Sequence, residues 1–181
     1  VALCNTQPFS RVLNGRRHVF CHNGDLKDIQ SSINLERFFP IGETDSEYAF
    51  CRLMDRISTF WQGEAPTLGQ RIDLICEVLF ELSRLGPANI LYSDSEFLYA
   101  FAHQRTQGNG HMEAPGLYYQ ERHCDCDPEA LQDSGLRLHN MAQNIVLFAS
   151  VPLSTDGWHA LPASQLMVAK HGEVIVTRDL R

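Results

Sequence analysis

The spacing of the apolar residues changes at Gly86-Pro87, and that change constrains the fold more than any other feature of the sequence. Before Gly86-Pro87, two segments repeat apolar residues with the period of an α-helix. After it, short segments alternate with the period of a β-strand and are separated by turn-forming residues. One strand, two tandem helices and then four or five mostly antiparallel strands predict helices stacked on sheet, which is an α+β layered domain.

Each of the two predicted helices opens with a capping signal. Thr44 with Glu47 places the first helix start near Asp45, and Thr67 with Gln70 places the second just after Thr67. Strands are predicted over residues 17–21, on both sides of 93–95, over 116–122 and 144–151, and as a hairpin over 166–176. The 181 residues therefore suggest one domain.

Composition and charge exclude several classes of protein. Hydrophobic residues make up 44% of the chain and charged residues 20%, which is ordinary for a globular protein with a packed core. The net charge is −7 and the longest basic run is Arg16-Arg17, so neither nucleic acid nor a membrane is an expected partner. No apolar run approaches the roughly 20 residues that a membrane span needs. The six cysteines are scattered, which indicates reduced thiols in a cytoplasmic protein.

The stretch Val19 to Leu26, with the sequence VFCHNGDL, combines an apolar run with an abrupt polar stop at His22-Asn23-Gly24. Asn-Gly after a β-prone run is the strongest short signal for a hairpin, since both residues tolerate positive φ. The local pattern therefore predicts a turn at Asn23-Gly24.

Two further groups of polar residues have both a structural and a functional interpretation. Asp45, in the first turn of a helix, stabilises that helix by about 0.3–1 kcal/mol through its interaction with the helix dipole, or else binds a ligand ammonium group. The run from His123 to Cys126, with the sequence HCDC, has the residue types of a metal site, with His139 as a partner. Its Cys-x-Cys spacing is not the usual one, so a loop with incidental thiols is favoured and no metal is expected.

Three segments taken together resemble the class II glutamine amidotransferases, which are N-terminal-nucleophile hydrolases. They are Asn5 to Phe9, then His22-Asn23-Gly24, and then Gly42 to Glu47. Their order in the chain, and the spacing of about 20 residues between the last two, are similar to those of the family. Ala149 to Leu153 and Trp158 with Leu161-Pro162 also fit the small stand-alone branch of the family. That branch includes glutamine amidotransferases and amidases that act on γ-glutamyl compounds.

The resemblance implies a four-layer αββα sandwich and a reaction without a cofactor. In this family an N-terminal cysteine attacks the amide of glutamine, its α-amine acts as the base, and water resolves the thioester. The Asn23 side chain and the Gly24 N–H would then donate to the oxyanion, each being worth about 2.7–4 kcal/mol. Asp45 would pair with the α-ammonium of the substrate, with His22 and Thr44 beside it in the substrate site.

Some residues of the family pattern have no match in this chain. The attacking cysteine and the arginine that grips the substrate carboxylate match no residue here, and Gln7 stands where the family often has histidine. We therefore expect residues 1–181 to form the C-terminal two-thirds of one glutamine amidotransferase domain, inactive alone, with the nucleophile in an upstream segment. The missing strand would leave an open sheet edge beside Asn23.

The resemblance leaves three functions open. The first is hydrolysis of glutamine, with the ammonia released or passed to a separate subunit. The second is cleavage of a γ-glutamyl peptide or thiol compound, and the third is binding without catalysis on the same fold. The expected partner is thus a small molecule, glutamine or a γ-glutamyl compound, with a homo-oligomer or an ammonia-accepting subunit as further partners.

Overall fold

The computed structural model describes residues 2–125 and 142–180. In chain order the elements of these residues are η1 Leu3–Asn5, β1 Phe9–Leu13, β2 Arg16–Gly24, α1 Ile29–Ser32, α2 Asp45–Phe60, α3 Leu68–Ser83, β3 Ala88–Ser93, β4 Leu98–Ala102, β5 Arg105–Thr106, β6 Met112–Glu113, β7 Tyr118–Asp125, β8 Ala142–Ala149, β9 His159–Ala160, β10 Gln165–Lys170 and β11 Glu173–Asp179.

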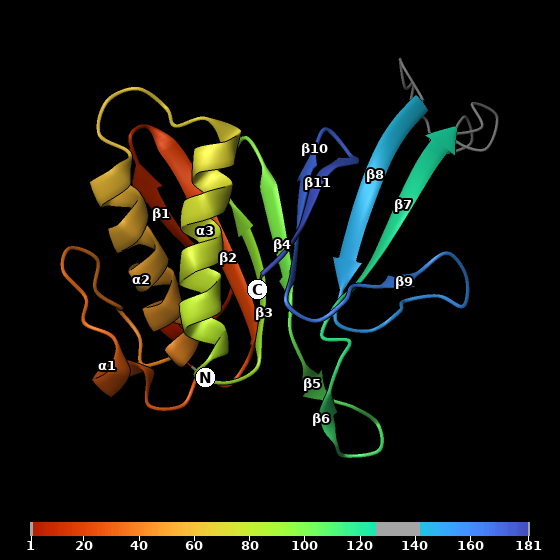
Figure 1. Ribbon diagram of the computed structural model, residues 1–181, viewed down its shortest axis with the longest axis horizontal. Coiled ribbons are helices and arrows are strands. Elements are labelled where there is room, and N and C mark those ends of the chain that lie inside the picture. Colours follow the sequence, from red (N-terminus) through yellow and green to blue (C-terminus); the bar gives the residue numbers. More distant parts are fainter. Residues whose placement is uncertain (1, 126–141, 181) are drawn as a thin grey trace.

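A six-stranded antiparallel sheet forms the middle of the described fold, in the order β1-β2-β3-β4-β10-β11. Helices α2 and α3 cover one face of it, and a smaller sheet with the order β8-β7-β9 lies on the other side (Figure 1). These are three layers of the expected αββα sandwich. In residues 2–125 and 142–180, the helices lie on the side of the six-stranded sheet that faces away from β7 and β8.

The larger core fills the space between the helices and the six-stranded sheet. Its members include Phe20 from β2 and Phe50 from α2, whose rings stack with centroids 5.3 Å apart. A smaller apolar cluster, which includes Leu117, Leu161 and Met167, lies between the two sheets. Because β2 packs against α2 through this larger core, the position of its last residues is fixed relative to the start of that helix.

Both predicted helix starts are confirmed, and the caps differ in detail. Thr67 and Gln70 form a complete capping box at the start of α3. At the start of α2, Thr44 accepts the Glu47 N–H at 3.1 Å, whereas the Glu47 carboxylate binds Arg11 and the Gly42 N–H instead. Glu47 is therefore diverted from the cap to a partly buried ion pair, which ties α2 to β1.

The predicted turn at Asn23-Gly24 is wrong. Strand β2 continues through Gly24, and its last two residues pair with Asn89 and Ala88 of β3. The hairpin turn lies at the other Asn-Gly pair, Asn14-Gly15, where φ is 50° and 74° and β1 turns into β2. Such a turn needs positive φ at both central residues, and this earlier pair adopts it. The second predicted turn, at His171-Gly172, is confirmed, with φ of 53° and 78°.

The helices of the described residues are too short or too polar to cross a membrane. Four cysteines in this part of the chain have free thiols, namely Cys4, Cys21, Cys51 and Cys76. Cys126 and His139 lie outside the described residues, so the absence of a metal site at 123–126 stays a prediction.

Candidate functional site

Three segments that are distant in sequence meet at the end of β2. The Asn5 side chain accepts the Glu43 N–H at 3.0 Å, which ties the first segment to the loop before α2. The Gln7 side chain bonds the main chain of His22, and the His22 ring bonds Ser46 at the start of α2. The structure therefore brings together the three segments that carry the family resemblance.

Strand alternation gives the end of β2 two different faces. His22 points toward the helices and its residue is only 6% exposed, whereas Asn23 points to the opposite face and is exposed. Gly24, on the face of His22, is exposed as well. The Asn23 Nδ2 donates to Ser150 Oγ at 2.8 Å, just beyond β8. One amide hydrogen of Asn23 thus fixes the side chain, and the second hydrogen is left for another acceptor.

Gly24 lies against the main chain that leads into β3. A Cβ at this position would lie 1.8 Å from the Pro87 carbonyl oxygen and 2.6 Å from His22 Nε2. The family resemblance implies that the N–H of this glycine donates to the oxyanion. The structure adds a reason for glycine at this position that does not depend on any ligand, because no side chain fits between Gly24 and Pro87.

A short chain of polar groups runs from Pro87 through His22 to the start of α2. His22 Nε2 lies 3.1 Å from the Pro87 carbonyl oxygen, which can only accept, so this nitrogen carries a proton. His22 Nδ1 lies 2.9 Å from Ser46 Oγ. Burial lowers the pKa of His22, although the Pro87 carbonyl and Asp45 act in the opposite direction. The ring is therefore neutral at neutral pH, and Nδ1 is an acceptor. The Ser46 hydroxyl has two acceptors within reach, His22 Nδ1 at 2.9 Å and Asp45 Oδ1 at 3.2 Å.

Asp45 is already partly engaged by the protein. Its Oδ2 accepts the Leu26 N–H at 2.8 Å, and its Oδ1 accepts the Ser46 N–H at 2.7 Å. The carboxylate lies 4.0 Å from His22 Nδ1 and its side chain is 28% exposed. Asp45 is thus fixed beside the end of β2, while part of its surface remains open to a cation.

The other two predicted substrate residues have internal roles in this structure. The His22 side chain is enclosed, so it acts on the site by fixing Ser46 and Pro87. The Thr44 hydroxyl caps α2, and its neighbour Glu47 pairs with Arg11. Burial raises the pKa of Glu47, but hydrogen bonds from Gly42, Ile41 and Arg11 outweigh it and lower the pKa overall. Direct substrate contact by His22 and Thr44 stays a prediction.

Asn89 on β3 is a part of this region that the sequence analysis missed. It is only 2% exposed and stands opposite Asn23 in the β2–β3 register. Its side chain donates to the carbonyl oxygens of Asn23 and Gln104, and accepts the His103 N–H. The available signal was a single polar residue in an apolar strand, since buried polar groups are seldom there without bonded partners.

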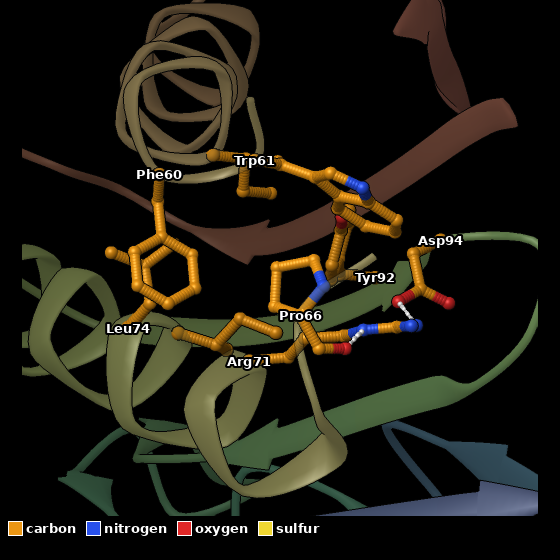
Figure 2. A pocket seen from close by; sticks show the side chains of 9 residues that line it. Phe60, Trp61, Pro66, Arg71, Leu74, Tyr92 and Asp94 are labelled. Atoms are coloured by element: carbon orange, nitrogen blue, oxygen red, sulfur yellow. Dashed lines mark hydrogen bonds and ion pairs between the residues drawn. The ribbon is translucent and has the colours of Figure 1, made fainter. Parts of the chain in front are cut away.

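A small enclosed pocket lies away from the end of β2, where α2 ends and α3 begins. The Arg71 Cζ lies 4.6 Å from the centre of the Trp61 ring, and its Nη1 lies 2.9 Å from Asp94 Oδ2. Pro66 also lines the pocket (Figure 2). The cavity measures only about 10 Å³, which is at the lower limit for one water molecule. This cluster therefore joins the two helices to the sheet and does not form a ligand site.

Burial makes three of the described thiols poor nucleophiles. It raises the pKa of Cys21 and Cys76, and it raises that of Cys51 to about 11. The thiolate is the reactive form, so these three cysteines are largely protonated and unreactive at neutral pH.

Comparison with known proteins adds a family to this geometry. A family model described as "Glutamine amidotransferases class-II" matches residues 1–181. An uncharacterized protein of Methanocaldococcus jannaschii is 31% identical over 176 residues, covering 94% of this chain and 46% of that protein. The Escherichia coli protein named "Putative glutamine amidotransferase YafJ" is 37% identical over 101 residues, covering 56% of this chain and 39% of its own length.

A solved structure matches most of the fold. The crystal structure of a "predicted glutamine amidotransferase" from Pseudomonas aeruginosa superposes with a TM-score of 0.73 at 26% sequence identity. The match covers 96% of this chain and 66% of that one. The chain spans less than half the length of the two curated relatives named above.

Proposed function

Because this chain belongs to the class II glutamine amidotransferase family, we propose that it forms the acyl-binding side of a site that cleaves γ-glutamyl amides. The observation that carries the proposal is the end of β2. There the exposed Asn23 amide and the Gly24 peptide lie beside the carboxylate of Asp45, held by contacts from both flanking segments.

The proposed reaction has two steps. The α-amine of a cysteine takes the proton of its thiol, and the thiolate attacks the side-chain carbonyl carbon of the substrate. The C–N bond then breaks, and ammonia or an amine leaves with the proton that the resulting α-ammonium returns. Water then adds to the thioester, the C–S bond breaks, and a γ-carboxylate and the thiol are released. The attacking cysteine of the family pattern matches none of the residues in this chain.

Each step passes through a tetrahedral intermediate with a negatively charged oxygen. The Asn23 Nδ2–H that does not bond Ser150, together with the Gly24 N–H, would donate to this oxygen. Both donors are neutral and are attached to a strand, so they need little reorganisation during the reaction. This is the arrangement by which an oxyanion hole lowers a barrier.

Asp45 would recognise the part of the substrate that does not react. Its carboxylate is partly exposed and is held by two main-chain N–H groups. One of these belongs to Leu26, two residues after Gly24, so Asp45 is tied to the segment that carries the oxyanion donors. A substrate α-ammonium could pair with its remaining accepting positions. Such binding fixes the position of the amide that reacts.

The test measures glutamate release from glutamine and from a γ-glutamyl dipeptide by the natural full-length protein. The Asn23→Ala variant should lower kcat by about 10²–10³ for the preferred substrate, because one preorganised donor is lost. Asn144→Ala is the matched control, since Asn144 is another exposed asparagine on a strand, far along β8 from Ser150.

The relative rates on the two substrates distinguish a glutaminase from an amidase of γ-glutamyl peptides. If Asn23→Ala turns over at the rate of Asn144→Ala, the oxyanion assignment is wrong. If the wild-type protein binds glutamine in calorimetry but hydrolyses neither compound, the protein is a binder rather than an enzyme.

A further inference from the structure

Asn89 has every hydrogen-bonding group of its side chain engaged while almost wholly buried. Its Nδ2 donates to the Asn23 carbonyl oxygen at 3.0 Å and to the Gln104 carbonyl oxygen at 2.9 Å. Its Oδ1 accepts the His103 N–H at 2.8 Å. These partners fix the orientation of the amide, because the flipped amide would place donors against the His103 N–H and an oxygen against two carbonyls.

The wall behind this side chain is also fixed. Gly116 passes so close to Asn89 that a Cβ there would lie 1.6 Å from Asn89 Oδ1. The amide is therefore enclosed by main chain from β2, from the segment after β4 and from the segment before β7. A side chain in such a site has little freedom to move, and neither do the groups that it binds.

The bond to Asn23 has a direct consequence for the next residue. The carbonyl of Asn23 and the N–H of Gly24 belong to one planar trans peptide unit, in which the two groups point in opposite directions. Holding the Asn23 carbonyl toward β3 therefore points the Gly24 N–H away from β3. That is the N–H assigned above to the oxyanion.

The opposite side of β2 is held as well. Pairing with β1 ends at Phe9 and Phe20, and β2 continues beyond it. There Gln7 takes the place of a strand, with its Nε2 donating to the His22 carbonyl oxygen at 2.9 Å and its Oε1 accepting the His22 N–H at 2.5 Å. Two side-chain amides thus hold successive peptide units of β2. The Asn89 amide binds the unit that contains the Gly24 N–H, where β2 also pairs with β3.

We propose that Asn89 is a positioning residue, whose bond to the Asn23 carbonyl directs the Gly24 N–H toward the oxyanion. The proposal rests on the function proposed above. Asn89 does not touch the substrate, and its contribution is to prevent this peptide unit from rotating. A donor that is already aligned stabilises the transition state without reorganisation, and a misaligned one does not.

The test uses Asn89→Asp in the natural full-length protein. The substitution keeps the size of the side chain and the acceptor for the His103 N–H, but it places an oxygen against the Asn23 and Gln104 carbonyls. Gln120→Glu is the matched control, because Gln120 is a buried strand amide whose Nε2 likewise donates to a carbonyl, that of Asp156.

We expect kcat of Asn89→Asp to fall about 10-fold or more below that of Gln120→Glu, with KM unchanged within about twofold. Affinity for glutamate γ-semialdehyde, whose adduct with a thiol carries an oxyanion, should fall by the same factor as kcat. Affinity for glutamate itself should stay unchanged. Equal kcat values for the two variants would overturn the positioning role, since both lose a buried amide.

A second measurement does not depend on turnover. In ¹H–¹⁵N spectra, the Gly24 amide resonance should shift in Asn89→Asp and stay in place in Gln120→Glu. An unmoved resonance means that Asn89 does not orient this peptide, and the inference is then wrong. A wild-type protein without activity on any γ-glutamyl amide would overturn the proposed function instead, while the resonance still decides whether Asn89 orients the Gly24 peptide.

Discussion

Replacing Gly24 with alanine tests how tightly the end of β2 is packed. The added methyl group would lie 1.8 Å from the Pro87 carbonyl oxygen, so the two strands must separate by about 1.2 Å to reach even 3.0 Å. The carbonyl cannot retreat freely, because it accepts the His22 Nε2–H and precedes β3 directly.

The expected cost follows from this geometry. Overpacking a well-packed region costs about 1–3 kcal/mol, and contact with main chain rather than with a flexible side chain places Gly24→Ala near about 3 kcal/mol. For a chain of this size, that corresponds to a fall in Tm of about 6–12 °C. Urea unfolding followed by circular dichroism gives the free energy directly.

Gly69→Ala is the matched control, since the same change is made where nothing lies within 4 Å of the new methyl group. Gly69 is in the first turn of α3, where alanine is preferred to glycine by up to about 1 kcal/mol. This variant should be as stable as the wild type or more so. If Gly24→Ala unfolds within about 1 kcal/mol of the wild type, Pro87 does not determine the residue at position 24.

Two further predictions concern charge. Asp45→Asn should raise KM for a substrate with an α-ammonium group. It should also lower the free energy of unfolding by about 1–2 kcal/mol, because the acceptor of one main-chain N–H is lost. If stability falls and KM is unchanged, Asp45 has a structural role only. Burial lowers the pKa of His18 and His22 below the unfolded value of 6.5, so the unfolded chain binds protons that the folded chain does not. The free energy of unfolding should be highest above about pH 6.5 and should fall as the pH drops toward the folded pKa values, by up to about 1.4 kcal/mol per pH unit for each histidine. Urea unfolding at about pH 7.5 and at about pH 5.5 measures the difference. The same free energy at both pH values would contradict this prediction.

The helices could be predicted from the sequence because their signals are local. A capping residue, a carboxylate or amide three positions on, and an apolar stripe all lie within a few turns of chain. Even there, the Glu47 side chain does not bind the main chain of the capping residue Thr44. It pairs instead with Arg11, 36 positions away in the sequence, in a partly buried ion pair. Local chemistry places the helix, and the tertiary fold determines what the side chain binds.

The turn at Asn23-Gly24 shows why the site was harder to predict. Two Asn-Gly pairs occur in the first 24 residues, and the sequence alone does not say which one turns the chain. Asn14-Gly15 has no partner in the β1–β2 register and forms the turn between these strands. Asn23-Gly24 instead pairs with Asn89 and Ala88, about 65 residues further along the chain. Pairing across that distance overrides the local preference.

The contact between Gly24 and Pro87 has a counterpart one step away, where a Cβ on Gly86 would lie 2.1 Å from the Asp25 carbonyl oxygen. At both glycines the nearest neighbour is therefore main chain from the facing segment, which leaves no space for a side chain at position 24 or 86. Saturation libraries at positions 24 and 86 should return almost only glycine. A protein engineer who wishes to reshape this region must therefore vary residues other than these two glycines.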